Sequence, residues 1–401
     1  MTGRTRPVAI AAAVLAAAVV LALLFRGSGL AVSMLTQIAW LAIVLLANNL
    51  LLGQCGLLSF GHAVQVGAGA LASIAAMRWG AVHGWMPLPL VPLCSGLAAM
   101  VVALPLAYVA TRSAGTAFAM VTLALGELAA ALALMLPEWF GGEAGLTADR
   151  VYGHWLGLDF ASPRQVCGLA LAYALAAGLA LYGLQRTALG RLFNAVRDNP
   201  ERAAFLGHDP RRLRWLAYAL AGFFAGVGGA LGAVQFEIVS APDALGLARS
   251  GSYLLFTYLG GSAHFLGPVL GSVLMVLAST LLAQWSAAWP LYLGLAFLLT
   301  VMFAPGGVAG LIAAAPGAVV ARGWPRCASA LAGALALTAG GIAAVEMAYR
   351  LHAAEPAWAW WPGRTLDPAA PLAWGCACAL LVAGAGLLAA ARLPAGQGAR
   401  R

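Results

Sequence analysis

Long uninterrupted apolar runs are the feature that most constrains this chain. They recur from end to end, and many approach the roughly 20 residues that a helix needs to cross the hydrocarbon core of a bilayer. Of the 401 residues, 63% are hydrophobic and only 9% are charged, whereas a soluble chain is about a quarter charged. The sequence therefore predicts an all-α, polytopic transmembrane helical bundle. It argues against a soluble enzyme, a nucleic-acid-binding protein and a membrane β-barrel.

The apolar runs predict about 10–12 spans, some of them broken. Glycine is frequent near 57–77 and 248–284, where we expect broken or re-entrant helices. Residues 59–73 and 262–279 share small residues, a histidine and a glycine-rich helix start, which suggests an inverted repeat. The runs lie at 8–25, 34–53, 57–77, 88–110, 115–136, 166–184, 215–236, 248–263, 265–284, 288–304, 327–347 and 373–391.

Arginine distribution predicts the orientation. All 22 basic residues are arginine. If the N-terminus is cytoplasmic and every run crosses, 15 arginines fall on the cytoplasmic side and seven on the other. We therefore expect both termini to be cytoplasmic and the net charge of +9 to encode topology. Region 1–33 is interpreted as an N-terminal transmembrane helix, with a signal peptide as the alternative.

The predicted inside loop 185–214 holds seven of the arginines and is expected to form two short helices. Gly190 is expected to end the preceding element. Asp198 or Asn199 is expected to cap the second short helix, with Pro200 at its first position. Gly207 is expected to end that helix in a left-handed conformation. Apolar faces on both helices need a partner groove or the membrane interface, and a plain charged connector is an equal alternative.

Polar residues inside apolar runs are candidates for a solute pathway. Ser59, His62 and Gln65 share one face if they lie on one helix. Such groups must face protein or water, so they line a substrate pathway or join helices. Glu127 is expected to be the only acid well inside a span. Its alternatives are binding an ammonium group, relaying a proton, and a structural or gating role.

The inside loop resembles the cytoplasmic coupling loop of ATP-binding cassette (ABC) importer permeases, and more narrowly that of the high-affinity branched-chain amino acid permease family. In this chain the similar pattern reads G-R-x-x-x-A-x-R-x-N-x-x-x-A-A-x-L-G over residues 190–207. The coupling residues that the resemblance implies are Gly190, Arg191, Ala195, Arg197, Asp198, Asn199, Glu201, Ala203, Ala204 and Gly207.

Four further segments resemble the same family in the expected order. They are LLGQCGLLSFGHA (51–63), GTAFAMVTLALGEL (115–128), GGSAHFLGPVLGS (260–272) and FAPGGVAGLI (303–312). On the second of these, Thr122 joins Glu127 in the predicted pathway, beside Ser59, His62 and Gln65. The resemblance implies a permease core at 34–319 that contains the coupling loop 185–214.

The resemblance also implies partners and a location. A permease of this kind works with two ABC ATPase subunits, a second homologous permease subunit or a second copy, a periplasmic or extracellular solute-binding protein, and membrane lipid. It lies in the bacterial cytoplasmic (inner) membrane as a multi-pass protein. The sequence has no phosphate-binding G-x-x-x-x-G-K-[ST] motif and no lysine, so we expect no enzyme activity and no cofactor in this chain. ATP is expected to bind to the partner subunits.

Departures from the family pattern leave the solute open. Gln65 and Val66 stand where the family usually has aromatic residues, and Leu71 replaces a common tyrosine. Branched-chain amino acids are the first expectation, and urea or a short amide is the alternative. An ion-coupled secondary transporter is less favoured because it needs further intramembrane acids. The sequence has no paired carboxylates and no histidine cluster, so it does not favour an intramembrane enzyme.

Residues 320–401 lie beyond the resemblance and are expected to form an extra C-terminal transmembrane hairpin.

Overall fold

The computed structural model describes residues 29–84, 86–153, 158–286, 288–304, 306–322, 324–353, 358–361, 364–366 and 371–392. The first predicted span, 8–25, lies outside these residues. The elements in chain order are α2 (Gly29–Asn49), π-helix η1 (Leu50–Gln54), α3 (His62–His83), 3₁₀-helix η2 (Leu88–Leu90), α4 (Val91–Ala110), α5 (Thr116–Met135), α6 (Pro137–Phe140), β1 (Leu146–Thr147), α7 (Pro163–Arg186), α8 (Ala188–Asp198), α9 (Pro200–Phe205), α10 (Pro210–Phe236), β2 (Ile238–Val239), α11 (Ala241–Leu245), α12 (Leu247–Gly260), α13 (Gly267–Leu277), π-helix η3 (Ala278–Leu282), α14 (Ala283–Trp285), α15 (Trp289–Phe303), α16 (Gly307–Arg322), α17 (Trp324–Ala353), β3 (Trp358–Trp361), β4 (Arg364–Leu366) and α18 (Pro371–Arg392).

The prediction of a polytopic helical protein is confirmed. Six helices among the described residues are long and apolar enough to cross a membrane, or seven if the bent pair Trp289–Phe303 and Gly307–Ala314 counts as one span. The six are Gly29–Gln54, Leu88–Ala110, Thr116–Met135, Pro163–Arg186, Pro210–Phe236 and Ala332–His352. The larger count of 10–12 includes α3 and shorter helices such as α12 and α13, and it stays a prediction, as does the inverted repeat.

By internal packing the described chain forms two compact units. The first comprises residues up to Leu277 together with Thr300–Gly310, and the second comprises Ala278–Leu299 and the residues from Leu311 onward. The domain boundaries expected from the sequence, at 33/34 and 319/320, stay predictions.

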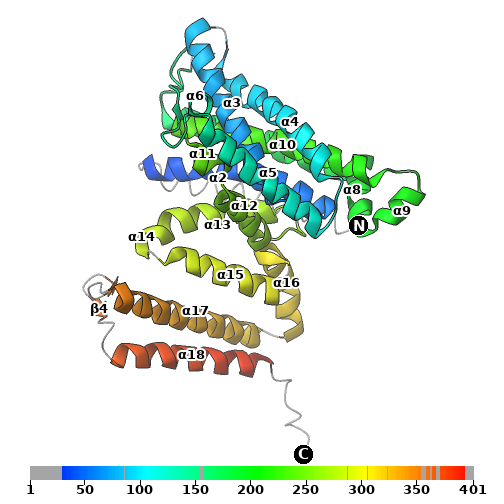
Figure 1. The fold of residues 1–401 in the computed structure, drawn as a ribbon. Helices are drawn as coiled ribbons and strands as arrows, with labels where there is room; N and C mark the ends of the chain where they lie inside the picture. Colours follow the sequence, from blue (N-terminus) through cyan, green and yellow to red (C-terminus); the bar gives the residue numbers. More distant parts are fainter. Residues whose placement is uncertain are drawn as a thin grey trace, which may run out of the picture. The chain divides into compact units, whose positions relative to one another are not determined.

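Helix α10 is the centre of the first unit. It packs on α2, α3 and α4, and Figure 1 shows it running beside α3 and α4. Its glycines bring the backbones into contact: a Cβ atom on Gly229 would lie 2.0 Å from the carbonyl oxygen of Val66, and one on Gly226 would lie 2.3 Å from the Cβ of Ala99. Small residues permit this close approach, which favours helix association in a membrane through van der Waals contact.

Two interruptions confirm the expected broken helices. After π-helix η1 the chain leaves helical geometry and returns to it at His62, the first residue of α3. Helices α12 and α13 are short and are separated by the turn 261–266. In the first interruption, the backbone N–H of Phe60 donates to Thr122 Oγ1 at 3.1 Å and that of Ala63 donates to Ser250 Oγ at 2.9 Å. Neighbouring helices therefore satisfy backbone groups that the break releases, as a bilayer requires.

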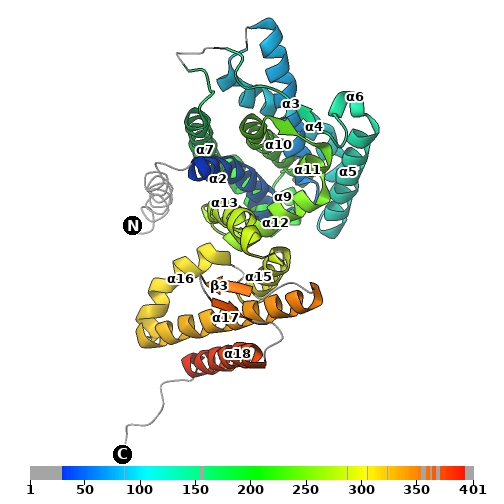
Figure 2. The same cartoon turned by 90° about the vertical axis from the view of Figure 1, so that its left-hand side faces the viewer.

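The second unit contains a helical hairpin. Helices α17 and α18 pack along each other, as both Figure 1 and Figure 2 show, and the antiparallel strands β3 and β4 lie between them in the sequence. The expectation that this hairpin crosses the membrane stays a prediction.

A buried carboxylate ties α17 to the segment that precedes and begins α15. The side chain of Glu346 is 2% exposed and accepts a hydrogen bond from Arg350 Nε at 2.9 Å. It also accepts one from Ser286 Oγ at 2.6 Å and one from Tyr292 OH at 3.0 Å. The expectation that Glu127 is the only acid well inside a span is therefore wrong, because Glu346 lies in the candidate span Ala332–His352. Glu346 stands near the end of its apolar run, where sequence alone does not separate a buried acid from an interfacial one.

We predict that Gly229→Ala lowers the stability of the first unit. The added methyl group would overlap the Val66 carbonyl, so α10 and α3 would have to separate, at a cost of roughly 1–3 kcal/mol. The thermal unfolding midpoint in detergent measures this loss. The matched control is Gly178→Ala in α7, where an added Cβ meets nothing within 4 Å. Equal midpoints for both variants would contradict the close packing.

We predict that Glu346→Ala destabilises the second unit far more than Glu346→Gln. Alanine removes the acceptor used by Ser286, Tyr292 and Arg350, and breaking a buried ion pair costs about 3–5 kcal/mol. Glutamine keeps a carbonyl acceptor. Limited proteolysis between α15 and α17, followed over temperature, reports the loss, and the exposed Glu143→Ala is the control. A Glu346→Ala variant as resistant as the control would contradict the assigned role of this carboxylate.

Candidate functional site

The segment between α7 and α10 folds into the two expected short helices. Thr187 Oγ1 accepts a hydrogen bond from the N–H of Gly190 at 3.3 Å at the start of α8, and Asn199 Oδ1 accepts one from the N–H of Arg202 at 2.9 Å at the start of α9. Asn199 is thus the cap, with Pro200 at the first position. Gly207, with φ of 85°, follows the end of α9 as expected.

The expectation for Gly190 is wrong. Helix α7 ends at Arg186, and Gly190 lies in the first turn of α8. Its lack of a side chain has another cause, because a Cβ atom there would lie 2.4 Å from the carbonyl oxygen of Leu184. Glycine therefore permits the sharp turn between the two helices and does not terminate either.

The two helices each have a buried side and an exposed side. Phe193 and Val196 are 0% and 2% exposed, and Phe193 packs among residues that include Leu50, Leu51 and Tyr218. Ala203 is also buried. The exposed predicted coupling residues are Arg191, Ala195, Arg197, Asp198, Asn199, Glu201, Ala204 and Gly207. Two apolar residues lie beside them: Leu206, the leucine of the family pattern, is 71% exposed, and Phe205, which the pattern does not specify, is 91% exposed.

Arg197 reaches from α8 into the first helix break. Its guanidinium donates from Nη1 to the carbonyl oxygen of Gly53 in η1, and from Nε to Asp198 Oδ1 at 3.1 Å. Its side chain remains 41% exposed. The Arg197 side chain therefore joins the predicted coupling loop to the interrupted span.

The predicted pathway residues Ser59, His62 and Gln65 come together around this break. All three are at most 1% exposed. Ser59 lies in the non-helical segment, however, and only His62 and Gln65 belong to α3. The Tyr218 hydroxyl of α10 lies beside Gln65 and Ser59. This tyrosine was not predicted, because it stands in an apolar run without a local polar pattern.

Several polar atoms in this group make no hydrogen bond of normal geometry to the described residues. They are Ser59 Oγ, His62 Nδ1 and both amide atoms of Gln65. Buried polar atoms without a partner are costly, so such sites normally hold water or a ligand in some state of the protein. The group is closed here and offers neutral donors and acceptors.

Thr122 and Glu127 lie on different sides of α5. Thr122 is fully buried, and its Oγ1 contacts the break through the N–H of Phe60. Glu127 lies on the exposed side of the same helix. The structure thus brings Thr122, but not Glu127, to the buried polar group.

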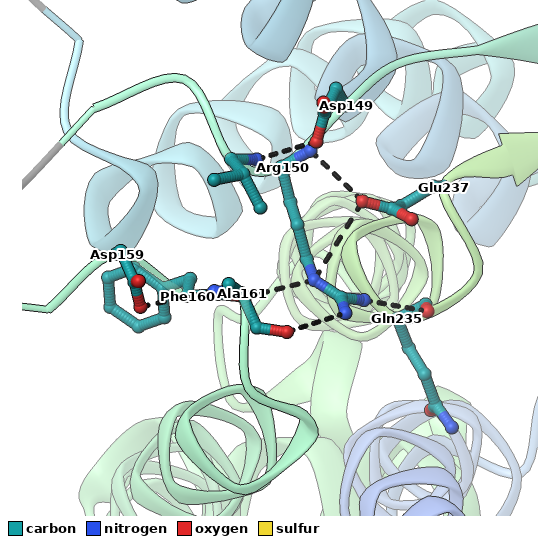
Figure 3. Close-up of polar contacts among 8 residues, drawn as sticks. Asp149, Arg150, Asp159, Phe160, Ala161, Gln235 and Glu237 are labelled. Carbon is teal, nitrogen blue, oxygen red and sulfur yellow. Dashed lines mark hydrogen bonds and ion pairs between the residues drawn. The ribbon is translucent and has the colours of Figure 1, made fainter.

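Arg150 holds the segment between α6 and α7 in place. This segment contacts the C-terminal end of α10, whereas the α8–α9 loop leads into its N-terminal end. Arg150 donates from Nε to the carbonyl oxygen of Phe160 at 3.0 Å and from Nη1 to that of Gln235 at 3.3 Å, and its backbone N–H donates to Glu237 Oε1 at 3.1 Å. Figure 3 shows these contacts meeting at Arg150. Phe160 and Glu237 have φ of 55° and 59°, which non-glycine residues rarely adopt.

Gln235 extends this network to α2. Its side-chain oxygen accepts from Trp40 Nε1 at 3.0 Å, and its side-chain nitrogen donates to the carbonyl oxygen of Ser33 at 3.0 Å. Strands β1 and β2 pair the same loop with the chain after α10. The loop between α6 and α7 is therefore fixed to α10 and, through Gln235, to α2. Its contacts run between distant residues, so no local pattern signals them.

No group of three or more histidine, cysteine or acidic residues in the described chain could hold a metal ion. The chemistry available at the buried group is hydrogen bonding by neutral side chains.

The comparisons with known proteins agree with these features. A family described as "Branched-chain amino acid transport system / permease component" matches residues 30–306. The "High-affinity branched-chain amino acid transport system permease protein LivM" of Escherichia coli is 27% identical over 285 residues, and its counterpart of the same name in Salmonella typhimurium is also 27% identical. Each alignment covers 66% of this chain and 66% of the relative.

A shorter similarity exists to the "Autoinducer 2 import system permease protein LsrC" of Klebsiella pneumoniae, which is 35% identical over 126 residues, 30% of this chain and 36% of that protein. No solved structure matches the chain. The family match spans the interrupted helices, the α8–α9 loop and the α10 core, so this chain belongs to the family of permease components of branched-chain amino acid transport systems.

Proposed function

We propose that the chain is the membrane-spanning permease subunit of an ABC importer that moves branched-chain amino acids into the cytoplasm, energised by separate ATPase subunits that bind ATP. The observation that carries the proposal is the α8–α9 loop, with its inner side anchored in the bundle and an apolar tip exposed on the other side. Family membership supports the class of transporter, and the names of the relatives support the solute.

The exposed tip supports an ATPase partner. Phe205 and Leu206 are mostly exposed, with Arg202 and Glu201 close to them in sequence. Clustered exposed apolar side chains beside charges mark a surface that a partner covers. Because Phe193 holds α8 in the core, a force applied at this tip reaches the bundle. Two ATPase subunits then require two such loops, one on each of two permease subunits.

The outer side of α5 supports contact with a second permease subunit, whether a homologous chain or a second copy. Glu127 lies on this exposed side, and an ionised carboxylate within a span is costly against lipid. A neighbouring protein surface would remove that cost. Among the exposed residues of α5, one series recurs at three- and four-residue steps, the spacing of a helix–helix seam: Ala117, Met120, Ala124, Glu127, Ala131 and Leu134.

The loop fixed by Arg150 supports docking of a periplasmic or extracellular solute-binding protein. In the proposed orientation, which has both termini in the cytoplasm, this loop faces away from the ATPases. A partner would meet a loop already held in one conformation, which lowers the entropy cost of association. The proposed location is the bacterial cytoplasmic (inner) membrane.

The buried group around the first break is proposed to line the solute pathway when the permease opens, with Ser59, His62, Gln65 and Thr122 as its hydrogen-bonding groups. Glu127 would act at the subunit contact. The neutral character of the buried group keeps urea or a short amide as the alternative solute. An ion-coupled transporter is less favoured, because the second intramembrane acid, Glu346, is paired with Arg350.

We predict that the chain imports leucine, isoleucine or valine into proteoliposomes only with ATP and its cognate ATPases, second permease subunit and binding protein. Uptake of radiolabelled solute is the measurement, with vesicles that lack the ATPases as the control. Uptake driven by an ion gradient without ATPases would contradict the ABC assignment. ATP-dependent uptake of urea alone would correct the solute and retain the class.

We predict that Phe205→Asp with Leu206→Asp reduces copurification of the ATPase at least tenfold while the chain stays folded. The two carboxylates would place charge in an apolar contact, which opposes association. Affinity purification from detergent measures the retained ATPase. The control is the exposed Glu138→Ala, which lies far along the chain from the loop. Unchanged copurification would exclude this tip as the contact.

A further inference from the structure

Arg197 lies between the α8–α9 loop and the first helix break, where the chain offers both an acceptor for its guanidinium and room for its stem. Its Nη1 donates to the carbonyl oxygen of Gly53, and its stem passes Gly56, where a Cβ atom would lie 2.7 Å from Arg197 Cγ. Gly56 also has φ of 68°, a conformation that L side chains rarely adopt. Glycine at this position thus serves both the backbone turn and the passage of the arginine stem.

The acceptor belongs to a helix end. Residues Leu50–Gln54 form a π-helix, and the helical geometry stops after Cys55, so the last carbonyl groups lack helical N–H partners. A basic side chain that donates to such a carbonyl stabilises the helix end. Here the donor comes from a different element, 144 residues away in the sequence. The contact therefore joins two elements, and a local helix cap would not do so.

Gly53 is also where other parts of the first unit meet. A Cβ atom on it would lie 2.4 Å from Asn49 Oδ1 and 2.6 Å from the carbonyl oxygen of Ser262, in the turn between α12 and α13. Downstream of Gly53, the chain leads within a few residues to Ser59 and His62. A displacement of Gly53 would thus act on both interrupted helices and on the buried polar group.

In this loop, apolar packing and the hydrogen bond to Gly53 are made by different side chains. Phe193 packs in the core and holds α8 by apolar contact, and Val196 is also buried, whereas Arg197 adds a directional bond at the edge of α8. Removal of the guanidinium would leave the apolar anchor in place. The charge of Arg197 is also balanced by Asp198, which lies 3.1 Å from it.

We propose that Arg197 is a positioning residue that converts movement of the α8–α9 loop into movement of the first helix break, and that it is not a contact to the ATPase. This inference rests on the proposed function, since it requires an ATPase that moves the loop. The hydrogen bond from Arg197 to the Gly53 carbonyl transmits the movement to η1, while the apolar contacts of α8 keep the loop attached to the bundle.

The test compares Arg197→Ala with wild type in the complete complex in proteoliposomes. We expect copurified ATPase to stay within about twofold of wild type, and the ATP hydrolysed per solute imported to rise at least tenfold. Arg197→Lys, which keeps a charged donor, is expected to restore part of the coupling. The control is Arg112→Ala, an exposed arginine at the end of α4, for which the ratio should equal that of wild type.

The outcomes separate the two hypotheses. A wild-type chain that binds no ATPase refutes the proposed function. A wild-type complex that works, with an Arg197→Ala ratio equal to wild type, refutes only the role of Arg197. Loss of ATPase binding in a folded Arg197→Ala chain would make Arg197 a direct contact and also overturn the inference. If the alanine variant does not fold, Arg197→Gln retains most of the stem beside Gly56, and the same ratio applies to it.

Discussion

Backbone contact between α10 and its neighbours is the constraint on which the first unit depends. Gly229 of α10 lies against the carbonyl of Val66 in α3, and Gly226 lies against the Cβ of Ala99 in α4, so the three helices meet with no more than a methyl group between them at these points. Lipid gives helices no hydrophobic reason to associate, which leaves close packing to hold them. The same helix continues to the α8–α9 loop at one end and to the Arg150 network at the other. Fixing its position therefore fixes the geometry of both surfaces.

The helix breaks create a second demand, because released backbone groups need partners inside a membrane. Thr122 and Ser250 meet this demand by accepting from backbone N–H groups, and Arg197 meets it by donating to a carbonyl. The side chains of Gln65 and Ser59 do not satisfy such backbone groups, and their polar atoms make no hydrogen bond of normal geometry to the described residues. A polar group that is neither structural nor exposed is the natural place for solute contact, and this separation supports the proposed pathway.

Local patterns predicted the short-range structure well. The amphipathic pieces, the Asn199 cap and the Gly207 terminus all follow from neighbours within four residues. The long-range contacts had no such signal: the bonds of Arg150 to Phe160 and Gln235, and that of Glu346 to Ser286, depend on how the chain returns to itself. Gly190 shows the same limit, because glycine favours both helix ends and close approaches, and only the Leu184 contact separates them.

The hydrogen bonds of Gln235 show how such a network limits the substitutions that the sequence can accept. Its amide uses its oxygen toward Trp40 and its nitrogen toward Ser33, while its backbone carbonyl receives Arg150. Glutamate would lose the donor, and a hydrophobic residue would lose both side-chain bonds. Substitution at any one of these positions thus changes what the others can accept. The C-terminal end of α10 should accordingly evolve as a unit, with replacements at these positions covarying among related chains.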